Sequence, residues 1–120
     1  MACGLAVAGD PVRIIYDTDI GNDIDDALAL ALLHSLESRG EARILAVTIT
    51  KDCPLSAPYV SLINAFYGRP DIPVGVVKNG RIPDTTNLLR APVEKRDAGG
   101  KLVYPRRITY GREAPDATGL

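Results

Sequence analysis

The chain is poor in the residues that mark several common classes of protein. Its 120 residues include no Trp, one Phe, one His and two Cys, and 14 Lys plus Arg nearly balance 15 Asp plus Glu. Two cysteines are too few for a disulfide framework, and Cys3 and Cys53 lack the spacing of a zinc site. Balanced charge offers no footprint for a nucleic acid or a membrane surface. The composition indicates one small soluble domain with unpaired thiols, which suits a reducing, cytoplasmic compartment.

The N-terminal residues, MACGLAVAGD, do not form a complete secretory signal. They lack a basic n-region, and their apolar run is too short. The tripeptide Ala6-Val7-Ala8 nevertheless matches a signal-peptidase site, so a signal-peptide remnant, with a secreted or periplasmic location, stays open as an alternative. We expect residues 1–10 to form an N-terminal tail and residues 11–120 to belong to one domain.

Hydrophobic patterns predict alternating strands and helices. Short β-branched runs are typical of buried strands, and they occupy residues 12–16, 43–50 and 72–77. Two apolar segments with helical periodicity lie between them, at residues 25–39 and 56–67, and a glycine follows each. The first helix is apolar on nearly all sides, with Leu28, Leu32 and Leu36 on one stripe and Ala29, Leu33 and Leu36 on its neighbour, so we expect it to pack against the sheet. This succession predicts an α/β fold, an open and mostly parallel sheet of Rossmann-like βαβαβ topology.

An acidic stretch separates the first predicted strand from the first predicted helix. Five carboxylates lie within DTDIGNDIDD, from Asp17 to Asp26. Turns and helix N-termini account for two or three of them, with Asn22 or Asp23 as a helix cap. The others repel one another unless a metal or a shared proton relieves the charge. We therefore predict a cation site rather than a purely structural cap, and oxygen ligands favour Ca²⁺ or Mg²⁺.

This cation site does not follow the EF-hand pattern. A calcium loop that started at Asp17 would need Gly at its sixth position and Glu at its twelfth, where Asn22 and Leu28 stand. The ligands are instead expected where strands end, because open parallel sheets bind ligands outside the carboxyl ends of their strands. The sole histidine, His34, shares its spacing with no carboxylate or cysteine, so we expect it to be a packing or surface residue.

The acidic stretch resembles a known family. A hydrophobic strand that ends in Asp-x-Asp, followed by Gly and by an Asp-Asp-Ala that opens a helix, is similar to the nucleoside hydrolases, the inosine-uridine preferring N-ribohydrolases. ILAVTIT and FYGRPDIPVGV also look like that family, so the resemblance covers residues 12–80 well. It implies Ca²⁺-dependent hydrolysis of the N-glycosidic bond of a small-molecule ribonucleoside, to give ribose and free base.

The resemblance also bears on the remainder of the chain. Family members are well over twice this length, so we expect an N-terminal portion with an incomplete site, a poor catalyst alone and a homo-oligomer when full length. Residues 78–120 show no sustained apolar period, and we expect an irregular, substrate-covering segment there. A natural basic tail is the alternative interpretation of this segment.

Site residues follow by resemblance from the positions of the motif. Asp19 corresponds to the catalytic base and a metal ligand, Asp26 to a bidentate metal ligand, and Asp17 to a supporting ligand. Asp25 corresponds to the residue that binds a ribose hydroxyl. Five residues separate Asp19 from Asp25, more than in the commonest family pattern, so Asp23 is an alternative to Asp25.

A second departure follows the second predicted strand. Thr50-Lys51-Asp52 stands where the family often carries Ala-Gly-Asn, which makes Asp52 the candidate substrate contact there.

Two rival functions come from other classes. Phosphatases of the haloacid dehalogenase type also carry Asp-x-Asp after a strand, with Mg²⁺ as cofactor, but Ile20-Gly21 breaks their Gly-Thr pattern. A non-catalytic calcium- or sugar-binding module would keep the acidic loop without turnover. The product distinguishes the three, because the hydrolase releases ribose, the phosphatase releases inorganic phosphate and the module releases neither.

Overall fold

The computed structural model describes residues 9–79, 87–109 and 111–117. Its elements, in chain order, are β1 (Val12–Thr18), α1 (Asp25–Ser38), β2 (Ala42–Ile49), α2 (Ser56–Phe66), β3 (Val74–Val76), α3 (Asn87–Glu94) and the 3₁₀ helix η1 (Gly111–Glu113). All the strands and helices expected between residues 12 and 77 are present, with ends close to those expected. Of the predicted N-terminal tail, residues 1–8 lie outside the described residues.

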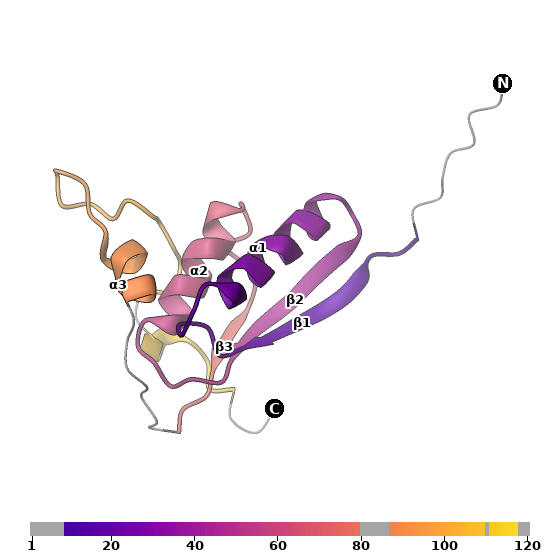
Figure 1. Ribbon diagram of the computed structural model, residues 1–120, viewed down its shortest axis with the longest axis horizontal. Coiled ribbons are helices and arrows are strands. Elements are labelled where there is room, and N and C mark those ends of the chain that lie inside the picture. The colour runs from indigo at the N-terminus through magenta and orange to yellow at the C-terminus, as the bar shows by residue number, and fades with distance from the viewer. Residues whose placement is uncertain (1–8, 80–86, 110, 118–120) are drawn as a thin grey trace.

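The strands form one parallel sheet in the order β1-β2-β3, which confirms the predicted α/β class and open-sheet topology. Helices α1 and α2 lie on the same face of this sheet (Figure 1). A bulge at Leu45 of β2 shifts the register, so that Ile14 pairs with Ile44 and Ile15 pairs with Ala46. Within the described ranges, no helix covers the opposite face, so side chains that alternate along β1 meet either the helices or solvent.

The core lies between the sheet and its two helices. Its most deeply buried side chains include Leu30 of α1, Val47 and Ile49 of β2, Val60 of α2 and Val76 of β3. Burying such apolar side chains contributes about 1.5–3 kcal/mol each relative to leaving them exposed. The three strands and two helices therefore share one hydrophobic core.

Helix α1 buries one of its several apolar sides. Ala27, Leu30 and His34 are buried, whereas Leu28 and Leu32 are 60% and 59% exposed. Of the stripe formed by Leu28, Leu32 and Leu36, the first two residues therefore stay exposed. The helix is apolar around most of its circumference, so the sequence pattern alone did not identify the buried side.

The predicted cap of α1 was wrong. Ile24 occupies the N-cap position without a side-chain hydrogen bond, so neither Asn22 nor Asp23 caps the helix. Instead, the Asp26 backbone N–H donates to Oδ1 of Asp25 at 3.0 Å. A carboxylate inside the first turn therefore satisfies one of the free donors at this helix end.

His34 packs where α1 meets α2, as the sequence indicated. It is fully buried, and its Nε2 lies 2.9 Å from Oδ1 of Asn64 on α2. Its ring also stacks on Tyr67 with centroids 4.7 Å apart. His34 thus forms part of a buried polar contact between the helices.

Part of the segment expected to be irregular is helical. Helix α3 packs on α2 and buries Leu89 and Val93, which lie one turn apart. Pro92 inside this short helix disguised its pattern in the sequence. Further along, Asp116 forms a parallel bridge with Val76, so the C-terminal part of the described chain runs beside β3. None of the helices in the described ranges has the length and apolar character needed to cross a membrane.

Candidate metal centre

The acidic loop joins the carboxyl end of β1 to the first turn of α1, and two of its residues anchor it. Ile20 is fully buried, and its N–H donates to Oγ1 of Thr18 at 3.1 Å. Gly21 has a φ of +125° and lies against the side chain of Leu89 in α3. The loop therefore has a fixed path, although most of its carboxylates are exposed.

Three carboxylates gather at the start of α1. Asp23, Asp25 and Asp26 each offer an oxygen, and these oxygens lie within 4.8 Å of one another. Oxygens that share one hard cation at about 2.3–2.6 Å lie no more than about 5 Å apart. The N-terminal end of α1 also favours negative charge at Asp25 and Asp26. This acidic triad, Asp23-Asp25-Asp26, could therefore hold a metal ion.

Asp23 and Asp25 shift each other's pKa in opposite directions. A hydrogen bond to Asp25 and the charge of that carboxylate raise the pKa of Asp23. The same hydrogen bond from Asp23, aided by the backbone N–H of Asp26, lowers the pKa of Asp25. A bound cation would relieve the repulsion between these neighbouring carboxylates.

Hydrogen bonds connect Asp26 to strand β1 of the sheet. It is half-buried, and the Tyr16 hydroxyl donates to its Oδ1 and to its backbone carbonyl oxygen, both at 3.1 Å. Burial raises the pKa of the Tyr16 phenol, and the neighbouring Asp26 carboxylate adds to this rise. Tyr16 therefore stays a hydrogen-bond donor and orients the one carboxylate of the triad that is partly shielded from water.

Asp19 lies beside the acidic triad with different partners. Its Oδ2 accepts a hydrogen bond from Nδ2 of Asn22 at 3.1 Å and lies 3.8 Å from Nζ of Lys51. Lys51 also donates to the side-chain oxygen of Asn22. The lysine therefore offsets part of the negative charge of Asp19. The place of Lys51 after β2 puts it at the same sheet edge as Asp19, as the predicted parallel sheet implies.

Asp17 lies apart from the triad. Tyr16 and Thr18 face the helices, so Asp17 points to the open face of the sheet, where its Oδ1 accepts a hydrogen bond from Oγ1 of Thr48 at 2.6 Å. Among the described residues, the structure brings Asp23, Asp25 and Asp26 together as a group that could share one ion, and Asp17 and Asp19 do not belong to it.

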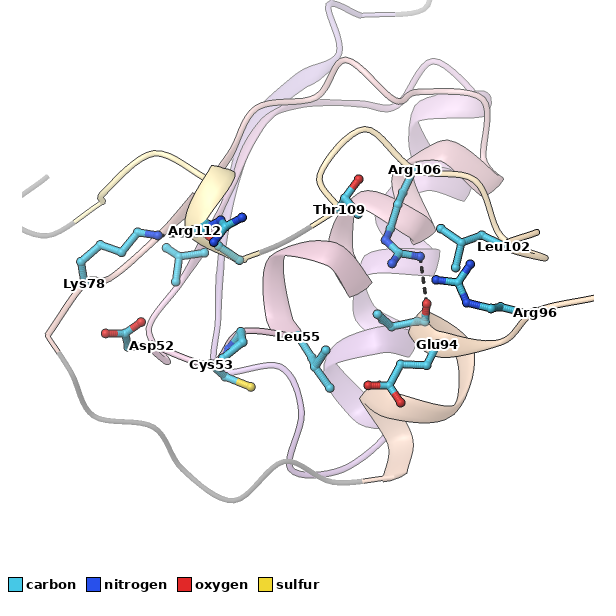
Figure 2. A pocket seen from close by; sticks show the side chains of 14 residues that line it. Asp52, Cys53, Leu55, Lys78, Glu94, Arg96, Leu102, Arg106, Thr109 and Arg112 are labelled. Atoms are coloured by element: carbon cyan, nitrogen blue, oxygen red, sulfur yellow. Dashed lines mark hydrogen bonds between the residues drawn. The ribbon is translucent and has the colours of Figure 1, made fainter. Parts of the chain in front are cut away.

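Asp52 lines a separate open pocket of about 1030 Å³ beyond the carboxyl ends of β2 and β3. Figure 2 shows Asp52, Lys78 and Arg112 toward one end of this pocket and Glu94, Arg96 and Arg106 toward the other. The Arg106 guanidinium donates to the backbone oxygen of Val93 at 2.9 Å. Cys53, also in the lining, is buried and free as expected, whereas Cys3 lies outside the described residues. Sequence reasoning did not identify the three arginines of this pocket, which come from a segment without a motif.

No protein-family model, curated protein or solved structure matches the chain. The functional argument therefore depends on the arrangement of the loop itself. That arrangement offers oxygen ligands for a hard cation, carboxylates that can accept hydrogen bonds from hydroxyl groups, and a lysine-paired carboxylate beside them.

Proposed function

We propose that this chain carries a Ca²⁺-dependent site of the nucleoside hydrolase kind, which hydrolyses the N-glycosidic bond of ribonucleosides to ribose and free base. The observation that carries the proposal is the acidic triad Asp23-Asp25-Asp26 at the junction of β1 and α1. The triad lies within the sequence motif that resembles that family. A small-molecule ribonucleoside is therefore the proposed substrate.

The donor set favours Ca²⁺. All the ligand atoms of the triad are carboxylate oxygens, which select hard cations over zinc or copper. Ca²⁺ also accepts irregular geometry and bidentate carboxylates more readily than Mg²⁺. When bound, Ca²⁺ would orient the ribose hydroxyls and lower the pKa of a coordinated water.

We assign the other steps of the reaction to side chains of this chain. We assign Asp19 to proton removal from the attacking water, because Asn22 fixes its carboxylate and Lys51 offsets its charge. Asp25 would accept a hydrogen bond from a ribose hydroxyl, and Asp23 is the alternative for that contact. Several carboxylates also suit the positive charge that develops on the sugar in a ribosyl cation-like transition state.

The 120-residue chain is expected to be a poor catalyst. Ca²⁺ takes roughly six to eight oxygens, and three carboxylates leave several positions to water. An ion held in this way binds weakly and orients the ribose poorly. We therefore expect weak Ca²⁺ affinity and slow ribose release.

The test combines binding with product analysis. Calorimetry with inosine or uridine should give heat only when Ca²⁺ is present, and Asp26→Asn should abolish it. A surface control, Lys101→Gln, should leave the heat unchanged. Long incubations at high protein concentration should release a small excess of ribose over an Asp19→Asn variant.

Each alternative outcome excludes part of the proposal. Nucleoside binding that is independent of Ca²⁺, or no binding at all, would contradict it. Ca²⁺-dependent binding with no excess of ribose would indicate a non-catalytic module instead. Inorganic phosphate released from a phosphate monoester with Mg²⁺ would favour the phosphatase.

A further inference from the structure

β1 is an edge strand of the described sheet, and half of its main-chain groups point away from β2. The Val12 N–H donates to Glu41 O at 3.0 Å, and the Thr18 carbonyl accepts from Thr50 N–H at 2.9 Å. Because successive residues alternate in direction, the N–H and C=O groups of Arg13, Ile15 and Asp17 point outward. This outer edge can pair with another strand.

The outer edge of β1 has little protection against such pairing. Natural edge strands are protected by Pro, charged side chains or a bulge, but β1 has no Pro, and the bulge at Leu45 belongs to β2. Its two charged residues, Arg13 and Asp17, have opposite signs. Ile15 is 62% exposed at its centre, on the face that the helices leave open. An exposed β-branched residue at the centre of such an edge favours pairing with a further strand.

We propose that two copies of this chain pair through β1, antiparallel, about a twofold axis at Ile15. In this register Ile15 lies opposite Ile15 of the second copy, and Arg13 lies opposite Asp17 of the second copy, twice by symmetry. The outward groups of these residues form about six main-chain hydrogen bonds between the copies. The result is one sheet that runs through both copies, with both α1 helices on the same face.

The charges on β1 favour a second copy of this chain as the pairing partner. Arg13 and Asp17 lie on the open face, equally far from Ile15, so a second copy is complementary to the first in charge as well as in shape. The Thr48 hydroxyl, 2.6 Å from Oδ1 of Asp17, holds that carboxylate on the open face. Within the described part of the chain, Arg13 takes part in no ion pair. Opposite charges directly across two strands stabilise the pairing.

Other arrangements of the same two strands are less favourable. A register shifted by two residues places Ile15 opposite Asp17 or opposite Arg13, and a shift by one moves side chains to the wrong face. A parallel arrangement opposes Arg13 to its own copy, and like charges across strands are destabilising. The antiparallel register centred on Ile15 is therefore the one that satisfies both charges.

Charge reversal tests the pairing by sedimentation velocity across a range of concentrations. The wild-type chain should form a dimer. Arg13→Asp or Asp17→Arg alone should raise the dissociation constant by roughly tenfold or more, and the double variant Arg13→Asp/Asp17→Arg should restore most of the affinity. Lys101→Asp, which makes the same charge change as Arg13→Asp at a distant exposed site, should leave the dissociation constant unchanged. Circular dichroism checks that each variant is folded.

A second measurement does not depend on these variants. Amide hydrogen exchange of Arg13, Ile15 and Asp17 in the wild type should slow as the protein concentration rises. The variant Ile15→Lys, which places two lysines opposite each other at the twofold axis, should remain a monomer. A wild-type monomer at every concentration would overturn the proposal. A dimer that is insensitive to the charge reversals, or an open-ended polymer, would overturn it equally.

Discussion

The Tyr16 hydroxyl lies 3.1 Å from Oδ1 of Asp26, and this hydrogen bond joins the core side of β1 to the first turn of α1. The two residues are ten apart in sequence, and the exposed acidic loop lies between them. A residue outside the acidic triad therefore sets the position of one of its carboxylates. Such supporting hydrogen bonds commonly determine how well a first ligand is oriented.

Tyr16→Phe should weaken both the fold and the metal site. Removing the hydroxyl deletes a part-buried hydrogen bond, so the free energy of unfolding should fall by about 0.5–1.5 kcal/mol in urea denaturation. Ca²⁺ affinity should fall as well, because Asp26 loses its orientation. Tyr104→Phe is the control, since the Tyr104 hydroxyl has no hydrogen bond to the described residues. Equal effects of the two substitutions would contradict this role of Tyr16.

Substitution of single carboxylates should separate the triad from its neighbours. Asp25→Asn and Asp26→Asn should each weaken Ca²⁺ binding by about tenfold or more, because each removes a charged ligand. Asp17→Asn and Asp52→Asn should leave the affinity nearly unchanged, since both side chains lie apart from the triad. Calorimetric titration measures all four variants. If Asp17→Asn weakens binding as much as Asp26→Asn, the metal site is centred elsewhere.

Ca²⁺ binding should depend on pH through the ionisation of Asp23. Asp25 raises the pKa of Asp23, so Asp23 is ionised and the affinity highest above that raised pKa. As pH falls through it, Ca²⁺ must displace a proton and the affinity falls. Calorimetry in buffers of different ionisation enthalpy should detect proton release in that range. The release should disappear in Asp23→Asn, and its persistence there would contradict the assignment.

The order of strands and helices up to residue 77 could be predicted because apolar runs and glycines mark it, but two packing features could not. Pro92 disguised α3, whose Leu89 and Val93 are buried only by contact with α2, distant in sequence. On α1, apolar residues surround the helix, so tertiary contacts alone decided that Leu30 is buried and Leu28 exposed.

The metal site could be predicted in part. The density of carboxylates predicted a cation site, and the structure supplies a group that could hold one. Which carboxylates share this group depends on the directions of their side chains, and the sequence motif does not specify those directions. Asp17 points away because side chains alternate along β1, and Lys51 reaches Asp19 because β2 pairs with β1. Local composition thus identified the acidic loop, while the arrangement of the sheet determined which of its carboxylates come together.

His34 should make the stability of the fold depend on pH. Burial lowers the pKa of His34, and the charge of Arg69, whose guanidinium lies 3.3 Å from Nδ1, lowers it further. The unfolded chain, with a pKa near 6.5, therefore binds this proton more readily than the folded chain. Its contribution to stability is present above pH of about 6.5 and is lost as pH falls toward the lowered value.

Urea denaturation between pH 7.5 and 5 measures this contribution in the wild type and in His34→Gln. The difference in unfolding free energy between the two proteins should change with pH over this range, with the wild type losing more stability as the solution becomes acidic. Glu37 and Asn64 also affect the pKa of the His34 ring, but both residues are present in the wild type and in the variant. A difference that is independent of pH would show that His34 does not titrate as the structure indicates.

Gly21→Ala should be more destabilising than Gly40→Ala, although both glycines have positive φ. At Gly40, with φ +74°, an added Cβ meets nothing within 4 Å, so the cost is the left-handed backbone alone, about 1–2 kcal/mol. At Gly21, with φ +125°, it would lie 2.7 Å from Cδ1 of Leu89, a side chain only 1% exposed that has little room to move. Overpacking adds about 1–3 kcal/mol to the strain. Urea denaturation should resolve this excess, and Leu89→Ala in the Gly21→Ala background should cost less than in the wild type, because it also removes the clash. Equal losses at the two glycines, or strict additivity with Leu89→Ala, would mean that the acidic loop does not rest on α3.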